Sequence, residues 1–282
     1  MSFTPLVSAD WLRDALRTAT PPVLIDTSFD LADTAAGERS YREAHLPGAH
    51  YLHLERDLSA PKTGRNGRHP LPARDDFAAV VGALGVTPAT QVVVYDRQQG
   101  MYAARAWWML RWLGHEAVAL LDGGVAAWTA SGGPLETTAP VARPASPYPA
   151  TTPRVGTLSA DELAARLGRV RLIDARAPER FRGEVEPLDA QAGHIPGALN
   201  RFFKDNLAAD GRFKPPAQLR AELEPLLGRQ PVHQVVHQCG SGVTACHNLL
   251  AMEVAGLGTT MLYPGSWSEW SADPARPVAR GV

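Results

Sequence analysis

Short runs of apolar and β-branched residues alternate along the chain with longer segments whose apolar positions follow a helical period. The strand-like runs are VLID (23–26), QVVVY (91–95), RLID (171–174) and QVVHQ (234–238). The helix-like segments are ADWLRDALR (9–17), RDDFAAVVGAL (74–84), ADELAARL (160–167) and AQLRAELEPLL (217–227). Because strands that alternate with helices favour parallel pairing, the pattern predicts an α/β fold of mainly parallel sheets with helices on both faces.

Four segments of the first half recur in the same order in the second half. The pairs are VLIDTSF (23–29) and RLIDARA (171–177), AHLPGA (44–49) and GHIPGA (193–198), QVVVYD (91–96) and QVVHQC (234–239), and LLDGG (120–124) and MLYPG (261–265). Their offsets of 148, 149, 143 and 141 residues differ little, which is typical of a duplicated domain. Residues 134–154 are rich in Pro, Thr and Ala and indicate a linker. We therefore predict one domain, with this linker, over 1–148 and a second over 149–282.

Composition and charge narrow the possible partners. The chain has 282 residues, of which 45% are hydrophobic, so each half can bury a core. Its formal net charge is −1 and no run of Lys or Arg stands out, which disfavours nucleic acid and anionic membrane surfaces. No apolar stretch approaches the roughly 20 residues of a membrane span, and the N-terminal residues do not resemble a signal peptide. We expect a cytoplasmic protein with neither nucleic-acid nor membrane partners.

Cys239 stands where a predicted strand turns into a predicted helix, in VVHQCGSGVTACHNLL (235–250). Parallel α/β sheets carry their active sites at such carboxyl ends of strands. Gly240 and Gly242 permit backbone angles that turn N–H groups inward as an anion-binding nest, and a helix that begins near Thr244 adds its positive dipole end. These features predict that Cys239 is held as a nucleophilic thiolate and that the loop can hold a persulfide. A buried, inert cysteine is the alternative.

Cys246 has different surroundings. It lies two helical turns further along among apolar residues, which favours a small core residue. A redox pair with Cys239 stays open, as does a zinc site that also uses His237 and His247, although adjacent ligands on a helix diverge by about 100°. Two cysteines make no disulfide framework, so we expect reduced thiols and no metal.

The first half serves as an internal control. Aligning VVVYD with VVHQC places Asp96 where Cys239 stands, so the first half has the scaffold without the nucleophile. One active site per chain follows. The His-x-Pro-Gly histidines, His45 and His194, occur in both halves, which favours a structural role over catalysis.

The duplicated halves, the HLPGA and HIPGA segments, the CGSGVT loop and GSWSEW (265–270) together resemble the tandem rhodanese-type sulfurtransferases. The loop is similar to that of members that use 3-mercaptopyruvate, whereas members that use thiosulfate more often carry Arg-Lys after the cysteine. The resemblance implies two rhodanese-like domains, the first inactive, and a ping-pong reaction without a cofactor. Cys239 would take a sulfur atom from the donor and pass it to cyanide or to a thiol, including thiols of thioredoxin-like proteins. Thiosulfate is the alternative donor.

The same resemblance implies roles for single residues. Ser241 matches a loop serine that assists the leaving enolate, and Arg180 matches an arginine that binds the donor's anionic end. The other loop residues of the substrate site are Gly240, Gly242, Val243 and Thr244. Members that use mercaptopyruvate usually carry a second arginine further along, where this chain has Leu188.

Two residues of the first half complete the set of candidates. His69 in GRHPLP and Glu55 in HLERDLS fall where the family places a His and an Asp that face the loop from the inactive domain. The glutamate departs from the family pattern. We therefore predict Cys239, Ser241, His69 and Glu55 as the catalytic group.

Two other classes of protein have a related pattern. A cysteine phosphatase of similar architecture needs a loop one residue longer and a terminal arginine to clamp the phosphate oxygens. Here the six residues from Cys239 to Thr244 close the loop without one. A non-catalytic sulfide- or protein-binding module would be expected to have lost the cysteine, as the first half has. Both classes remain alternatives to the transferase.

Overall fold

The computed structural model describes residues 4–140 and 146–282, which divide into two compact units. The first unit holds the residues up to Ala60, Pro72–Arg154 and Asp210–Arg212. The second holds Pro61–Leu71, Val155–Ala209 and Phe213–Val282. A short segment from the first half of the sequence, Pro61–Leu71, is thus part of the second unit.

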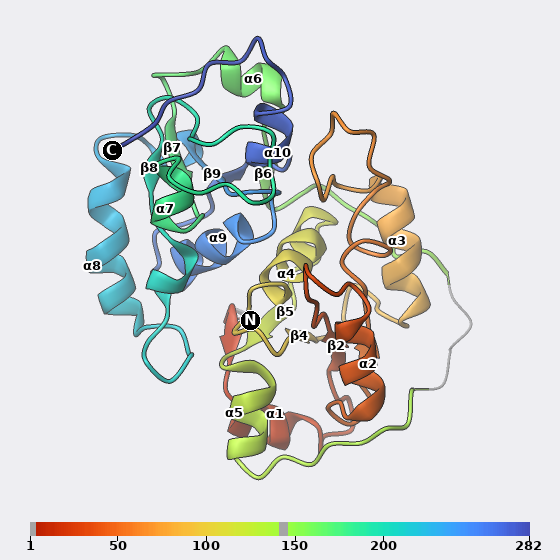
Figure 1. Ribbon diagram of the computed structural model, residues 1–282. Helices are drawn as coiled ribbons and strands as arrows, with labels where there is room; N and C mark the ends of the chain where they lie inside the picture. Colours follow the sequence, from red (N-terminus) through yellow and green to blue (C-terminus); the bar gives the residue numbers. More distant parts are fainter. Residues whose placement is uncertain (1–3, 141–145) are drawn as a thin grey trace. The chain divides into compact units, whose positions relative to one another are not determined.

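Each unit is built on a five-stranded sheet in which every pair of neighbouring strands is parallel (Figure 1). The first contains β1 (Leu6–Val7), β2 (Val23–Asp26), β3 (His50–Tyr51), β4 (Val92–Tyr95) and β5 (Val118–Leu121), in the order β1-β5-β4-β2-β3. The second contains β6 (Gly156–Thr157), β7 (Arg171–Asp174), β8 (Leu199–Asn200), β9 (Val235–Gln238) and β10 (Met261–Leu262), in the order β6-β10-β9-β7-β8. The two orders are the same when the strands are counted within each unit, which confirms the duplicated α/β architecture.

Helices cover both faces of each sheet. The first unit has α1 (Ala9–Ala15), α2 (Ala36–Glu43), α3 (Arg74–Ala83), α4 (Ala103–Trp112) and α5 (Gly124–Ala130). The second has α6 (Ala160–Ala164), α7 (Pro178–Phe181), α8 (Pro216–Leu227), α9 (Ala245–Val254) and α10 (Ser266–Trp270), with short 3-10 turns at Phe203–Asn206 and Val232–Gln234. The four helices predicted from periodicity correspond to α1, α3, α6 and α8.

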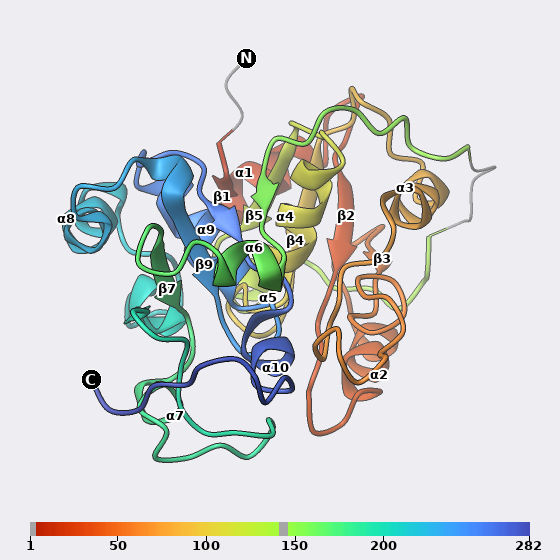
Figure 2. The same cartoon turned by 90° about the horizontal axis from the view of Figure 1, so that it is seen from above.

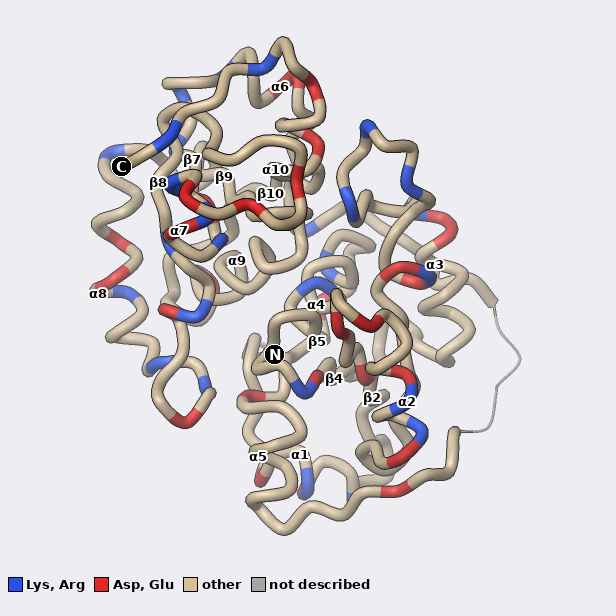
Figure 3. Tube along the Cα trace, in the orientation of Figure 1, with Lys and Arg blue, Asp and Glu red and all other residues tan. Residues whose placement is uncertain are grey.

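Side-chain alternation along the strands explains why helices pack on both faces of each sheet. In the second unit, Leu172 and Val236 point to one face, where they pack against Leu163 of α6 and Trp267 of α10. The intervening strand positions point to the opposite face, on which α9 packs against β9 and α8 packs against α9 (Figure 2). In the described part of the chain, no helix has both the length and the apolar character needed to cross a bilayer. Acidic and basic residues are intermixed along both units (Figure 3).

The two His-x-Pro-Gly histidines have the same structural role in both units. His45 donates from Nδ1 to the carbonyl oxygen of Tyr41 at 2.7 Å, and its ring stacks on that of Tyr41. His194 donates from Nδ1 to the carbonyl oxygen of Phe181 at 2.8 Å and stacks on its ring. Each histidine is therefore bonded to a carbonyl of a nearby helix, α2 or α7, whether or not the unit carries a cysteine.

His237 on β9 is fully buried, and neither ring nitrogen has a hydrogen-bond partner among the described residues. Burial lowers the pKa of His237 to about 3. In the unfolded chain a histidine binds its proton near pH 6.5, so below that pH the unfolded state takes up more protons than the folded state. The stability that depends on neutral His237 is complete above about pH 6.5 and is lost as the pH falls toward about 3.

We predict that this histidine alone lowers the free energy of unfolding by about 3 kcal/mol between pH 7 and pH 4. The variant His237→Leu lacks the titrating group and loses no apolar packing, so its stability should fall less over the same range. Urea unfolding of both proteins at pH 7, 5 and 4 measures the difference. Equal losses in the two proteins would contradict the prediction.

Candidate functional site

Cys239 directly follows the central strand β9, and its loop is fastened to the start of α10. The Cys239 N–H donates to Ser266 Oγ at 3.1 Å, and the Cys239 carbonyl accepts from the Trp267 N–H at 3.0 Å. The next carbonyl, that of Gly240, accepts from the Ser268 N–H at 2.9 Å. Cys239 is only 2% exposed. The backbone on the amino side of the loop is therefore held fixed, as a site for a positioned nucleophile requires.

The two loop glycines are present for different physical reasons. Gly242 has φ +76°, and a Cβ there would lie 2.3 Å from the carbonyl oxygen of Pro264, so both conformation and space require glycine. Gly240 has no positive φ. A Cβ at Gly240 would instead lie 2.7 Å from Nη2 of Arg68. At Gly240 the missing side chain makes room for a guanidinium group.

The other end of the loop runs into α9. Thr244 is the residue before the first turn of α9, which matches the predicted helix start. The Val243 carbonyl accepts from the Cys246 N–H at 3.0 Å, and the Thr244 carbonyl accepts from the His247 N–H at 3.1 Å. The helix therefore begins immediately after the loop, and its first turn directs the positive end of its dipole toward it.

Ser241 and His69 lie together in the second unit. Ser241 Oγ and His69 Nδ1 are hydrogen-bond partners 2.8 Å apart, and both side chains are buried. The backbone beside His69 is fixed because the Arg68 N–H donates to Ser268 Oγ at 3.0 Å. Glu55 belongs to the first unit, where its N–H donates to His53 Nδ1 at 3.1 Å. That Glu55 faces the loop stays a prediction.

Arg180, on α7, is paired with two carboxylates. Its Nη2 lies 2.6 Å from Glu186 and 3.2 Å from Asp189. Asp189 also forms an ion pair with Nη1 of Arg68. Burial raises the pKa of Asp189 and Glu186 adds to the effect, against the pull of Arg68 and Arg180. Behind this group the buried Arg176 pairs with Glu186 at 3.3 Å.

The sequence analysis missed Arg68, Glu186 and Asp189. Arg68 and Asp189 pair across 121 residues of sequence, and Glu186 pairs with Arg176 and Arg180 within one irregular segment. Neither periodicity nor a local motif reveals these contacts. The one available signal is that Arg68 immediately precedes His69 in GRHPLP. Leu188 stands where similar proteins usually carry a second arginine, and it is 46% exposed.

Both cysteines are free thiols. Cys246 is fully buried, and its Sγ donates to the Gly242 carbonyl at 3.4 Å, so it packs beneath the loop. Across residues 4–140 and 146–282, no group of three or more His, Cys, Asp or Glu side chains is arranged to hold a metal ion. The prediction of Cys246 as a small buried residue agrees with its environment.

The corresponding loop of the first unit holds a buried carboxyl group of its own. Asp96 directly follows β4, the counterpart of β9. Its carboxylate accepts four backbone N–H groups at 2.8–2.9 Å, donated by Gln98, Gly100, Tyr102 and Ala103. Burial raises the pKa of Asp96, and these four N–H groups oppose that shift because they favour the carboxylate. This loop type therefore gathers backbone donors around one acidic group.

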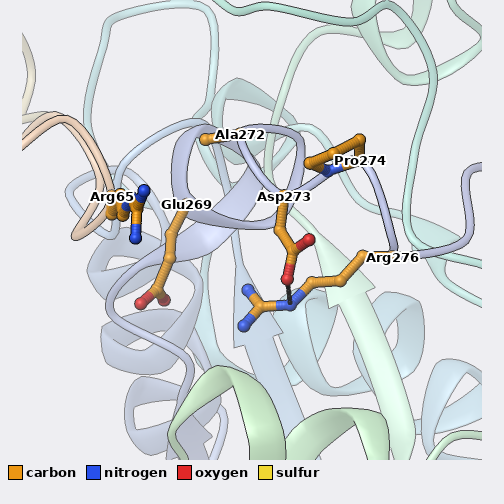
Figure 4. A pocket seen from close by; sticks show the side chains of 6 residues that line it. All are labelled: Arg65, Glu269, Ala272, Asp273, Pro274 and Arg276. Carbon is orange, nitrogen blue, oxygen red and sulfur yellow. Dashed lines mark ion pairs between the residues drawn. The ribbon is translucent and has the colours of Figure 1, made fainter.

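A separate pocket of about 410 Å³ lies in the second unit and is drawn in Figure 4. It is lined by Arg65, Glu269, Ala272, Asp273, Pro274 and Arg276. Arg276 pairs with Asp273 at 3.4 Å and with Asp161 at 3.3 Å. None of the predicted site residues is among the residues that line this pocket.

Comparison with known proteins agrees with this geometry. The model of the rhodanese-like domain matches residues 8–131 and 159–273. A probable 3-mercaptopyruvate sulfurtransferase of Pseudomonas aeruginosa is 50% identical over 286 residues, with all of both chains covered. A putative thiosulfate sulfurtransferase of Mycobacterium tuberculosis is 40% identical, covering 98% of this chain and 97% of the relative. The solved 3-mercaptopyruvate sulfurtransferase of Leishmania major has a TM-score of 0.83 at 30% identity, covering 94% of this chain and 74% of that one. The chain therefore belongs to the rhodanese-like domain family and carries two copies of the domain.

Proposed function

We propose that this protein is a sulfurtransferase that moves a sulfane sulfur from 3-mercaptopyruvate to cyanide or a thiol through a persulfide on Cys239. The observation that supports this most directly is the juxtaposition at the end of β9. There a buried cysteine lies in the same fixed loop as Ser241, which is paired with His69 at 2.8 Å. The transfer of a sulfur atom from the donor to a cysteine needs a nucleophile, a hydroxyl that can stabilise the leaving enolate and a base that orients this hydroxyl.

In the first half-reaction the Cys239 thiolate attacks the donor sulfur and forms an S–S bond. The carbon–sulfur bond of mercaptopyruvate breaks, and its electron pair leaves on carbon as the enolate of pyruvate, which then takes up a proton. Ser241 Oγ–H donates a hydrogen bond toward the enolate oxygen, and His69 orients that hydroxyl. In the second half-reaction cyanide or a thiolate attacks the outer sulfur, and Cys239 leaves as the thiolate.

The loop of the first unit supports persulfide storage. At the same position in the first unit, the Asp96 carboxyl group accepts four backbone N–H groups. A persulfide anion on Cys239 would draw on donors of the same kind. The first unit, with its cradle filled by Asp96, is proposed to be catalytically inactive.

The acceptor is any group able to attack the outer sulfur of a persulfide. Cyanide and small thiols qualify, and so do the exposed thiols of thioredoxin-like proteins, which we propose as protein acceptors. Two free cysteines suit a reducing compartment, which supports the proposed cytoplasmic location.

We predict a kcat/KM for 3-mercaptopyruvate at least about 10-fold higher than for thiosulfate. The loop residues Gly240, Ser241 and Gly242 supply no cation of their own, whereas Ser241 can stabilise an enolate that only mercaptopyruvate generates. Steady-state rates with both donors, at the same pH and ionic strength and with cyanide as the acceptor, measure this ratio. A preference for thiosulfate would support the alternative, a thiosulfate:cyanide sulfurtransferase with the same persulfide. No transfer from either donor would refute the proposed function.

A further inference from the structure

We infer that the pocket drawn in Figure 4 binds a small polar α-amino acid in its zwitterionic form. The ammonium group of the ligand lies against Glu269, and its carboxylate lies against Arg65 and Arg276. The pocket is separate from the Cys239 loop, and the inference does not rest on the proposed function. Its basis is that side chains of opposite charge line one pocket of the second unit without pairing across it.

Glu269 and Arg65 carry opposite charges and line the same pocket. Within residues 4–140 and 146–282, neither of these side chains forms an ion pair, whereas Arg276 pairs with Asp273 at 3.4 Å. Figure 4 accordingly draws a single ion pair among the lining residues, and the Arg276 side chain extends toward the side of the pocket where Glu269 lies. Charges held apart in this way can each meet the opposite end of a ligand that carries both.

Arg276 keeps one nitrogen free of internal acceptors. Its Nη2 lies 3.3 Å from Asp161 and its Nε 3.4 Å from Asp273, and the guanidinium lies over the ring of Trp270 at 5.3 Å. The remaining nitrogen, Nη1, has no hydrogen-bond partner among the described residues. A ligand oxygen that approaches Nη1 therefore displaces no protein acceptor. The other contacts hold the guanidinium in place before a ligand arrives.

The carboxylate of Glu269 is positioned by close packing. A Cβ built on Gly265 would lie 1.7 Å from Oε2 of Glu269, so glycine is needed to admit this carboxylate. Its neighbour Tyr263 is fully buried. Burial raises the pKa of Tyr263, and the negative charge of Glu269 adds to the effect. Tyr263 therefore stays neutral and cannot compensate the charge of Glu269, which a ligand ammonium group can.

The loop that carries Arg65 is fixed at the pocket. The Thr63 N–H donates to Asn66 Oδ1 at 2.8 Å, which closes the loop around Arg65. At Gly67, with φ +82°, a Cβ would lie 2.8 Å from the Gly265 carbonyl oxygen, so the loop passes close to the segment that leads into α10. The Arg65 residue itself is exposed, so its guanidinium is accessible to a ligand.

The charge balance favours a zwitterion over a simple anion. Arg65 and Arg276 supply two positive charges, and Glu269, Asp273 and Asp161 supply three negative charges. The resulting net charge of −1 attracts an ammonium group and disfavours an anion that lacks one. The two arginines in turn give a carboxylate its partners. The pocket volume of about 410 Å³ is sufficient for an amino acid with a short polar side chain.

Three matched probes test this selectivity on the full chain. L-Serine carries both charges and has no thiol that could react at Cys239. 3-Hydroxypropanoate has the same skeleton without the ammonium group, and ethanolamine has it without the carboxylate. Ligand-observed NMR titrations measure the three Kd values. We expect L-serine to bind at least about 10-fold more tightly than either of the other probes, because each of them loses one charge-assisted contact.

Two variants with matched controls locate the site. Glu269→Gln removes the charge at nearly constant shape, and Glu224→Gln makes the same change at an exposed residue of α8. Arg65→Leu is compared with Arg169→Leu, another exposed arginine of the second unit. We expect Glu269→Gln and Arg65→Leu each to raise the Kd of L-serine about 10-fold, and the two controls to leave it unchanged.

Thermal unfolding of each variant shows that it is folded before its Kd is compared. Absence of L-serine binding to the wild type would overturn the inference. The same holds if L-serine binds but neither Glu269→Gln nor Arg65→Leu weakens it, since the ligand would then lie elsewhere. Equal binding of 3-hydroxypropanoate or ethanolamine would also overturn it, because the pocket would then recognise one charge only.

Discussion

The variant Cys239→Ser should lose sulfur transfer by more than about 10³-fold, because an un-ionised hydroxyl is a far weaker nucleophile than a thiolate and cannot form a persulfide. The change replaces one atom in a loop whose backbone is fixed by Ser266 and Trp267, so the fold should be retained. Incubation of the wild type with 3-mercaptopyruvate should add one sulfur, about 32 Da, to the peptide that contains Cys239. Intact-protein and peptide mass spectrometry measure the label, and a cyanide assay measures turnover.

The second cysteine provides the matched control. Cys246→Ser changes the same atom on the other side of the loop, and the new hydroxyl can still donate to the Gly242 carbonyl. This variant should keep the mass label and most of its activity. Turnover by Cys239→Ser, or a label that moves to Cys246, would show that the persulfide on Cys239 is not the intermediate.

Asp96→Ala should destabilise the first unit by about 3–5 kcal/mol, a large share of the total stability of a typical domain. Among the described residues, Asp96 is the acceptor for the N–H groups of Gln98, Gly100, Tyr102 and Ala103, and the change removes it. Asp96 is 1% exposed, so water can replace the carboxylate only in part. Urea unfolding followed by tryptophan fluorescence measures the loss.

An exposed aspartate of the same unit controls for the charge. Asp14 is exposed and lies 3.8 Å from Arg17, so Asp14→Ala should change stability by less than about 0.5 kcal/mol. If Asp96→Ala is no less stable than Asp14→Ala, the loop of the first unit does not depend on its internal anion. The comparison with the Cys239 loop would then lose its support.

The cysteine loop could be located directly from the sequence because it is local. Cys239 follows a β-branched run and precedes a helix, and both elements arise from residues adjacent in the chain. The duplication could also be detected in the sequence, because four paired segments appear in the same order in both halves. The two sheets, which share one strand order, confirm it. The apolar helix α4 had no helical period of polar residues and was not predicted, because a helix buried on most sides carries no polar face.

By itself, the sequence determined the α/β class, the repeat, the cysteine loop and the aspartate, Asp96, that the first copy has in place of the cysteine. Only the tertiary structure decided which unit holds His69 and which charges surround the loop. The resemblance placed His69 at the loop but as part of the inactive domain, whereas segment Pro61–Leu71 comes from the first half and packs in the second unit. Arg68, in the same segment, had no role in the sequence analysis. The physical reason is that ion pairs and close backbone approaches join residues distant in the chain, and no local pattern encodes them.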